Sequence, residues 1–428
     1  MVPTALSSKI YGMFAREILD SRGNPTIETT VVSESGYRGG ASVPAGASLG
    51  KYEARELRDG DKTRYSGMGV TKAVTAVNTT IAAKLKGADV TNQREIDRVL
   101  CALDGTEDKH SLGANSILSV SLAASACASA LQRIPLYKYF NTMMNERMPV
   151  PLQRIPTPTV NVINGGKHGA GNLDFQEFHI VSASGKSFHD ALRLSVEIYH
   201  SLKAILIYRN AIHSVGDEGG FAPNLFTNLD ALELLQEAIR ATPYRLGVDV
   251  FFGLDIAASH FKNDRGYQIK DKPTPLAPKD FISYIEDLHK SYRLLMLEDP
   301  LYEDDWTGWQ EITRRLGSDV MIVGDDFLAT NKKRLERAIA DKACTAILVK
   351  PNQIGTLSEF LDVVALAKKN NVQVVVSHRS GETNDTIIAD LGVGVQADYV
   401  KFGAPARGER VAKYNRLLQI EAELFSQK

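Results

Sequence analysis

The chain has 428 residues, of which 43% are hydrophobic and 24% charged, and its formal net charge is −1. A chain of this length exceeds what one ordinary hydrophobic core holds, so we expect two domains. The near-zero net charge argues against a nucleic acid or an anionic membrane bound through bulk electrostatics. The N-terminal segment has no charged region followed by an apolar run, so we expect no secretory signal, no membrane anchor and a cytoplasmic protein. Three widely spaced cysteines without a CxxC motif indicate reduced thiols, in keeping with that location.

The N-terminal part of the chain changes its hydrophobic period along its length. Residues 8–60 alternate short β-like runs with turns, and turn signals at 23–25 and 34–36 predict a meander of about three strands. Residues 71–131 carry apolar side chains at helical spacing. Helix cannot continue through the proline-rich stretch at 148–160. We therefore predict an N-terminal α+β lid domain at residues 1–145 and a second domain at 146–428.

One segment, residues 111–132, carries no charge over a length that could span a membrane. The segment is rich in alanine and serine, which drive insertion into a bilayer weakly if at all. We interpret it as a tightly packed core helix.

The second domain alternates apolar strand-like runs with helical segments, and six of the runs end at an ionisable residue. The run ends follow one another at roughly 30-residue intervals, the repeat of a (β/α)8 barrel. The first interval is longer and holds an extra excursion. The six residues are Asp255, Glu298, Asp325, Lys350, His378 and Lys401. Because the carboxyl ends of barrel strands converge on the active site, we predict an α/β chain whose C-terminal (β/α)8-type barrel carries its site at these residues.

Three of the run ends, Asp255, Glu298 and Asp325, are carboxylates on neighbouring strands. A ligand set of oxygens alone, without His or Cys, suits a hard divalent cation such as Mg²⁺ or Mn²⁺ better than zinc. The histidines of the chain show no HExxH spacing, which agrees with this choice.

Cationic residues follow the carboxylates along the chain. Lys350 ends a core strand, where desolvation of a lysine is costly, and this cost suggests a functional role. Desolvation and neighbouring cations favour the neutral amine, which is a base. A metal ion and a lysine base are the groups needed to remove a proton α to a carboxylate. Arg379 would meet a second anionic group of the same substrate.

Upstream loops supply candidate acids. A glycine-containing loop holds His168, with Gln176 and Glu177 on the run that follows it, and a second glycine-flanked turn holds Glu218. Taken alone, such a turn is more often a solvated one. A Gly/Ala/Ser-rich loop near residues 39–61 suits closure over a ligand, although an ordinary mobile loop has the same composition.

At these residues the sequence closely resembles the enolase family, over residues 8–425. The matching stretches include DSRGNPT, NVINGG, VGDEGGFAPN, KPNQIGT, SHRSGET and GAPARGER. The resemblance implies a glycolytic lyase that reversibly dehydrates 2-phosphoglycerate to phosphoenolpyruvate. Sites of the enolase superfamily are known to use a lysine or histidine base with one or two Mg²⁺ ions.

The resemblance also implies a role for each site residue. The metal ligands would be Asp255, Glu298 and Asp325 for a first Mg²⁺, with Ser48 joining a second Mg²⁺ that arrives with substrate. The catalytic residues would be Lys350 as the α-proton base and Glu218 as the acid for the leaving hydroxyl, supported by Glu177 and His168. The substrate ligands would be Gln176, Arg379 (on the phosphate), Ser380, Lys401 and His378.

The chain departs from the family pattern at five positions. They are Leu49, Lys167, His260, Asn384 and Phe402. None of them removes a named catalytic group. They bear on loop closure, turnover and metal affinity.

Two other kinds of function compete with this one. A superfamily acid-sugar dehydratase or racemase is the alternative enzyme, and the long lid and the Arg379-Ser380 pair speak against it. The family implies a homodimer. Some enolases bind plasminogen through a terminal lysine, a role open to Lys428. The retained catalytic groups argue against a purely structural protein.

Overall fold

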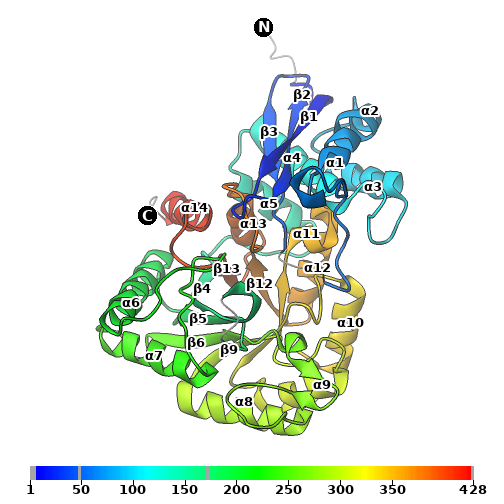
Figure 1. The fold of residues 1–428 in the computed structure, drawn as a ribbon. Helices are drawn as coiled ribbons and strands as arrows, with labels where there is room; N and C mark the ends of the chain where they lie inside the picture. Colours follow the sequence, from blue (N-terminus) through cyan, green and yellow to red (C-terminus); the bar gives the residue numbers. More distant parts are fainter. Residues whose placement is uncertain (1–5, 47–49, 170–172, 426–428) are drawn as a thin grey trace. The chain divides into compact units, whose positions relative to one another are not determined.

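The computed structural model describes residues 6–46, 50–169 and 173–425 (Figure 1). The chain forms two compact units. The first comprises Met1–Gln153, Val349–Leu366 and Arg379–Gln396, and the second comprises Arg154–Leu348, Ala367–His378 and Ala397–Lys428. Two late segments of the chain thus belong to the same unit as the N-terminal part. The predicted boundary between residues 145 and 146 stays a prediction.

The first unit begins with an antiparallel sheet. Strands β1 (Ile10–Leu19), β2 (Pro25–Ser33) and β3 (Arg38–Ser42) lie in that order. Leu19 pairs with Pro25 across the first turn, and Val32 pairs with Arg38 across the second. The predicted three-stranded meander and its two turns are confirmed.

The first unit also contains a set of helices. They are η1 (Tyr65–Gly67), α1 (Thr71–Ala76), η2 (Val77–Ile81), α2 (Ala82–Leu85), α3 (Gln93–Asp104), α4 (Ala114–Gln132), α5 (Leu136–Asn145), α11 (Pro351–Ile354), α13 (Ile387–Gly394) and the larger part of α12 (Leu357–Lys369). Among the described helices, α4 alone has the length and hydropathy to cross a membrane, and 89% of its most apolar window is buried. Strand β3 approaches it so closely that a Cβ at Gly39 would lie 2.0 Å from the backbone nitrogen of Cys127. The interpretation of this segment as a core helix is confirmed.

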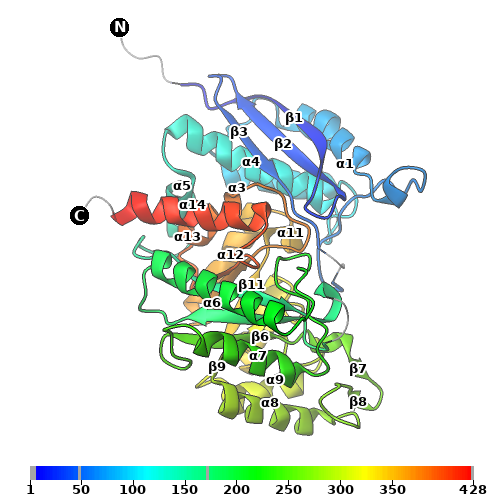
Figure 2. The same ribbon diagram turned by 60° about the vertical axis from the view of Figure 1, so that its left-hand side comes forward.

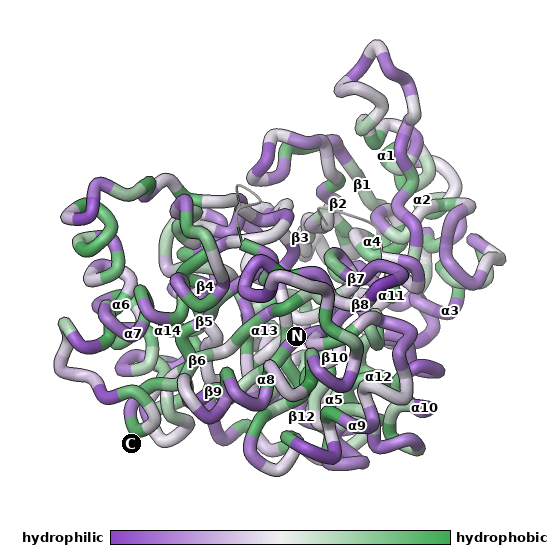
Figure 3. Tube along the Cα trace, turned by 60° about the horizontal axis from the view of Figure 1, so that its bottom comes forward, coloured by the Kyte–Doolittle hydropathy of each residue, from purple (hydrophilic) through white to green (hydrophobic). Residues whose placement is uncertain are grey.

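The second unit contains a closed eight-stranded barrel, as predicted. Its strands are β4 (Thr157–Asn164), β5 (Glu177–Ser182), β6 (Val250–Asp255), β9 (Leu294–Glu298), β10 (Met321–Gly324), β11 (Ala346–Val349), β12 (Gln373–Ser377) and β13 (Tyr399–Lys401), in the spatial order β10-β11-β12-β13-β4-β5-β6-β9. Buried apolar side chains fill the interior, among them Val181, Met296, Val323, Leu348 and Val375. Figure 3 shows green, apolar stretches along the barrel strands and purple, polar stretches on peripheral loops.

One strand of the barrel departs from a uniform (β/α)8 repeat. Strand β5 runs antiparallel to both β4 and β6, whereas β6 and β9 are parallel. A loop with the short helix η3 (Gly166–His168) connects β4 to β5. Two neighbouring strands joined without a crossover helix run antiparallel. The first residue of β5 therefore lies at the same edge of the barrel as the last residues of β4 and β6.

The remaining elements of this unit are helices around the barrel and one hairpin. The helices are α6 (Phe188–Tyr208), α7 (Asn228–Arg240), η4 (Ala258–His260), α8 (Pro278–Tyr292), α9 (Trp306–Leu316), α10 (Lys332–Asp341) and α14 (Gly408–Phe425). The predicted excursion after β6 contains the hairpin β7 (Lys262–Asn263) and β8 (Gly266–Tyr267). Helix α14 lies beside α6 (Figure 2), where the Glu421 carboxylate accepts the backbone N–H of Phe188 at 2.7 Å.

Candidate active site

Ionisable side chains gather at one edge of the barrel, as the sequence predicts. Strands β6, β9 and β13 end at Asp255, Glu298 and Lys401. Asp325 directly follows β10, and His378 directly follows β12. Asp255 pairs in register with Glu298, and Ser377 with Lys401. These strands run parallel, so their carboxyl ends meet at a single edge.

The ammonium group of Lys401 lies among three buried carboxylates. Its Nζ is 2.8 Å from Glu298, 3.1 Å from Asp255 and 3.3 Å from Glu177. We call these four residues the carboxylate cluster. Gln176 joins its rim, since the Gln176 side-chain amide donates to Asp255 at 3.2 Å. One ammonium offsets only one of three possible negative charges.

The pKa values of the carboxylate cluster reflect this imbalance. Burial and the charge of Asp255 raise the pKa of Glu298 well above its usual value, although Lys401 acts against them. Burial alone would lower the pKa of Lys401, but Asp255, Glu177 and Glu298 raise it well above its usual value. Lys401 is therefore a permanent cation, and a further cation would be needed to hold Glu298 ionised beside it. A hard divalent ion suits such a set of buried oxygens.

Asp299 extends the acidic groups toward Asp325. Its carboxylate accepts the backbone N–H groups of Asp325 at 2.9 Å and Asp326 at 2.7 Å. Burial, with the charges of Asp326 and Asp325, raises the pKa of Asp299 well above its usual value. These three aspartates form a group with one ligand oxygen of each within 4.8 Å of the others, so they could hold a metal ion. Whether Asp325 shares an ion with Asp255 and Glu298 stays a prediction.

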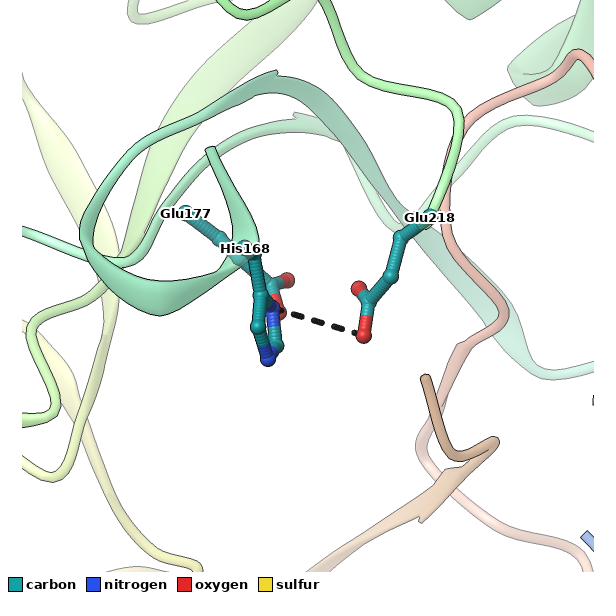
Figure 4. A group of neighbouring side chains, drawn as sticks. All are labelled: His168, Glu177 and Glu218. Carbon is teal, nitrogen blue, oxygen red and sulfur yellow. Dashed lines mark hydrogen bonds and ion pairs between the residues drawn. The ribbon is translucent and has the colours of Figure 1, made fainter. Parts of the chain in front are cut away.

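A second group of side chains brings two loop residues, His168 and Glu218, to Glu177 at the start of β5. His168 lies in η3, and its Nδ1 is 3.0 Å from Glu177 and 3.4 Å from Glu218. Glu218 lies in a tight turn that a hydrogen bond from the Gly219 N–H to the Gly216 carbonyl closes at 3.1 Å. The three side chains point toward one another (Figure 4), and they too could hold a metal ion.

His378 completes this second group. Its Nε2 is 3.2 Å from Glu218, and its Nδ1 is 2.6 Å from Arg410 Nη1. Arginine has donors only, so His378 Nδ1 must accept, and the proton of the neutral ring lies on Nε2, facing Glu218. We call His168, Glu218, His378 and Arg410 the imidazole cluster. The tautomer of His378 is thus fixed by Arg410.

The two imidazoles have opposite pKa shifts. Burial opposes the charged form of His168, but the charge of Glu218 and the contact with Glu177 raise the pKa of His168 above its usual value. Burial lowers the pKa of His378, with the Arg410 charge adding to that effect. Against burial and the charge of Glu177, the neighbouring His378 and His168 lower the pKa of Glu218. The free protein therefore holds Glu218 as a carboxylate.

The other predicted site residues belong to the first unit. Lys350 directly follows β11 and precedes α11. The Arg379 guanidinium donates to Glu53 at 2.8 Å and to Asn352 at 3.1 Å, and it is buried with them. Ser380 follows and is buried as well. Ser48 lies outside the described residues. The roles of these residues stay predictions.

The departures from the family pattern differ in their surroundings. Lys167 and Asn384 are exposed. Phe402 is buried, with its ring centroid 6.1 Å from that of Tyr414, so it serves packing. His260 ends η4. Leu49 lies outside the described residues.

Four residues of these groups are not among the sequence predictions. Asp299 directly follows Glu298 and precedes a proline, and nothing in this EDP motif by itself marks Asp299 as part of a site. His179 Nε2 contacts Glu177 at 2.7 Å, and its spacing of two residues on one strand face is a readable signal. Arg410 and Glu53 contact partners far away in the sequence, so no local pattern marks them.

Comparison with known families covers both parts of the chain. A family model described as the enolase N-terminal domain matches residues 10–140. A second, described as the enolase C-terminal TIM barrel domain, matches residues 152–428.

Proposed function

This chain belongs to the enolase family, and on that premise we propose that it is the glycolytic enolase, which reversibly dehydrates 2-phosphoglycerate to phosphoenolpyruvate with Mg²⁺. The observation that carries the proposal is the carboxylate cluster, where buried Asp255, Glu298 and Glu177 share the single ammonium of Lys401. Such a set of oxygens has the chemistry of a divalent-cation site at the edge where barrel enzymes act.

Asp255, Glu298 and Asp325 would hold the first Mg²⁺, and Ser48 would join the second when substrate binds. When bound, Mg²⁺ supplies charge that stabilises electron density on the substrate carboxylate. Asp299 supports this role because it accepts the backbone N–H groups of Asp325 and Asp326 and so fixes the segment that carries Asp325.

Lys350 would remove the proton α to the carboxylate. It directly follows a buried apolar strand, a position where desolvation disfavours an ammonium. A neutral lysine amine can accept the proton as a general base. The electron pair of the broken C–H bond then remains on the substrate until the hydroxyl leaves.

Glu218 would protonate the leaving hydroxyl. Because its pKa is lowered, Glu218 is a carboxylate in the free protein and must first take up a proton. His168, with a raised pKa and its Nδ1 3.4 Å from Glu218, is placed to deliver one. The Nε2 of His378 lies 3.2 Å from the other oxygen of Glu218, so the carboxyl group stands between the two imidazoles.

The remaining residues would bind and orient substrate. Arg379 and Ser380 would hold the phosphate, since a guanidinium fork matches phosphate oxygens. The other substrate ligands would be Gln176, His378 and Lys401. The alternative is an acid-sugar dehydratase or racemase of the same superfamily.

The test is an ultraviolet assay of phosphoenolpyruvate formation from 2-phosphoglycerate, with Mg²⁺ and with a chelator. We expect formation of phosphoenolpyruvate only with Mg²⁺. A purified, folded protein without this activity would show that the family chemistry acts here on another carboxylate, which a panel of acid sugars would then identify.

We further propose a cytoplasmic homodimer, as the family implies. Sedimentation measures the dimer directly. Plasminogen binding through Lys428 is a separate proposal, and Lys428 lies outside the described residues. Removal of this residue should abolish such binding and leave dehydration unchanged.

A further inference from the structure

Glu53, a buried residue of the GKYEA stretch, occupies the guanidinium fork of Arg379. Arg379 Nη1 donates to Glu53 Oε2 at 2.8 Å, and Nη2 donates to Oε1 at 3.3 Å. Only about 7% of either residue is exposed. This is the bidentate arrangement in which arginine also binds phosphate.

The same carboxylate holds two further segments of the first unit. Gln353 of α11 donates its side-chain amide to Glu53 Oε1 at 3.4 Å. The backbone N–H of Gly50 donates to this oxygen at 3.2 Å, and the Glu53 N–H donates to the Gly50 carbonyl at 3.3 Å. A Cβ at Gly50 would lie 2.8 Å from Glu53 Oε1, so any other residue there would require the Glu53 carboxylate to shift. Glu53 thus connects the 50–53 turn, α11 and Arg379.

We propose that Glu53 is an internal competitor of the substrate phosphate, a positioning residue that acts through Arg379. In the absence of substrate it neutralises the buried guanidinium, which would otherwise be an uncompensated charge. A phosphate that takes both Nη groups of Arg379 must displace this carboxylate or share the fork with it. Repulsion between the two anions then weakens phosphate binding.

Displacement of Glu53 has a consequence for the chain around it. The hydrogen bond from the Gly50 N–H depends on the position of the Glu53 carboxylate. A shift of this side chain breaks that bond and leaves the 50–53 turn held by the backbone bond from the Glu53 N–H to the Gly50 carbonyl. Phosphate binding to Arg379 is thereby coupled to the conformation of that turn. The inference rests on the proposed function, which assigns the substrate phosphate to Arg379.

The test measures the Kd of inorganic phosphate, with Mg²⁺ present, for wild-type protein and three variants. Glu53→Gln retains the size and an acceptor oxygen but removes the charge, and we expect phosphate to bind about tenfold more tightly. Glu56→Gln is the matched control: Glu56 pairs with Arg58 in the same segment, so its loss should leave the Kd unchanged. Arg379→Lys cannot form the fork and should weaken binding.

Kinetics provide a readout that a purely structural role would not produce. In Glu53→Gln both KM for 2-phosphoglycerate and kcat should fall, because substrate and the phosphorylated product are both held more tightly. If the Gln variant folds poorly, Glu53→Asp retains the charge but cannot reach both Nη groups, and it should show a smaller gain in phosphate affinity.

The outcomes separate the inference from the proposed function. Unchanged or weaker phosphate binding in the Glu53 variants, with binding lost in Arg379→Lys, overturns the competitor role and leaves the function standing. Wild-type phosphate affinity in Arg379→Lys shows instead that the phosphate site itself is assigned wrongly.

Discussion

Glu177 of the carboxylate cluster also contacts His168 of the imidazole cluster. The two clusters are nevertheless built from different parts of the chain. Asp255, Glu298 and Lys401 are the last residues of barrel strands. His168 and Glu218 lie in loops that glycines shape. Strand ladders fix side-chain directions, which suits the binding of an ion in one geometry. Loops adjust more easily, which suits groups that pass a proton and must change partners.

The clusters also differ in their charge. The carboxylate cluster has more negative charge than its ammonium offsets, and the raised pKa of Glu298 shows it. In the imidazole cluster each carboxylate oxygen of Glu218 faces an imidazole nitrogen, and the pKa of Glu218 is lowered. The first cluster has one ammonium for three carboxyl groups. The second can redistribute a proton among groups already present. Variants of the two clusters should therefore lose activity or stability for different reasons, and added Mg²⁺ should restore stability only in the first cluster.

The largest effect should come from removal of the metal ion. A chelator should abolish dehydration and added Mg²⁺ should restore it, because Asp255, Glu298 and Asp325 offer oxygen ligands only. Asp255→Asn should lose activity at any practical Mg²⁺ concentration. Asp249, just before the opposite end of β6, is the control, and Asp249→Asn should keep the wild-type metal response. Full activity after exhaustive chelation contradicts the metal site.

Next in size is the loss of the acid. Glu218→Gln keeps the shape but cannot donate a proton, so dehydration should fall by about 10²–10⁴-fold. Exchange of the substrate α-hydrogen with deuterated solvent, followed by NMR, should continue because base and metal ligands remain. Lys350→Ala should lose both reactions. Exchange at the wild-type rate in Lys350→Ala would falsify the assignment of Lys350 as the base.

A third test concerns the ammonium of the carboxylate cluster. Lys401→Met leaves buried carboxylates without their partner and should cost about 3–5 kcal/mol of unfolding free energy. Part of this loss should return with Mg²⁺, since the ion supplies positive charge to the same oxygens. Lys109→Met, which breaks a buried lysine's pair with Glu359, should lose stability without recovery by Mg²⁺. Urea unfolding with and without Mg²⁺ measures both; equal recovery in the two variants contradicts the idea.

The smallest effect is a difference in pH dependence between the two imidazoles. The raised pKa of His168 stabilises the fold below pH about 6.5, and this contribution disappears as pH rises through the folded-state pKa. The lowered pKa of His378 has the opposite effect on stability. Below pH about 6.5 the unfolded chain binds a proton at this ring that the folded protein does not bind, so acidification destabilises the fold.

Metal-free urea unfolding at pH 5.5 and 8.5 tests this pair. His168→Gln should lose more stability at the lower pH. His378→Gln should lose less stability on acidification than wild type does. If the pH dependence of the unfolding free energy changed in the same direction in both variants, the two rings would have the same electrostatic environment, which contradicts the prediction.

The sequence predicted the strand-borne residues better than the loop-borne ones. Apolar runs that end at Asp255, Glu298 and Lys401 are visible as patterns, and a parallel barrel brings such ends to one edge. Glycine-containing loops mark His168 and Glu218 as candidates and the resemblance implies their roles, but no pattern in the chain states that they meet.

What could not be predicted depends on tertiary contacts. Hydrophobic periodicity does not encode the direction of a strand, so it cannot predict the reversal of β5. Arg410 and Glu53 act on His378 and Arg379, partners far from them along the chain. The charge balance around Lys401 likewise becomes visible only from the distances between its ammonium group and the carboxylates in the folded chain.

The reversal of β5 bears on where the chain could be cut. Its start, Glu177, lies opposite Asp255 at the active edge, while its end, Ser182, lies opposite Val250 at the other edge. Both anchors of the β4–β5 loop are therefore at the active edge, and the β5–α6 connection at 183–187 is at the other. A circular permutant with new termini at 183–187 would keep each strand-end side chain on an unbroken ladder. A permutant opened between Gly165 and Gln176 would instead place the new termini beside His168 and Glu177, to which we assign catalytic roles.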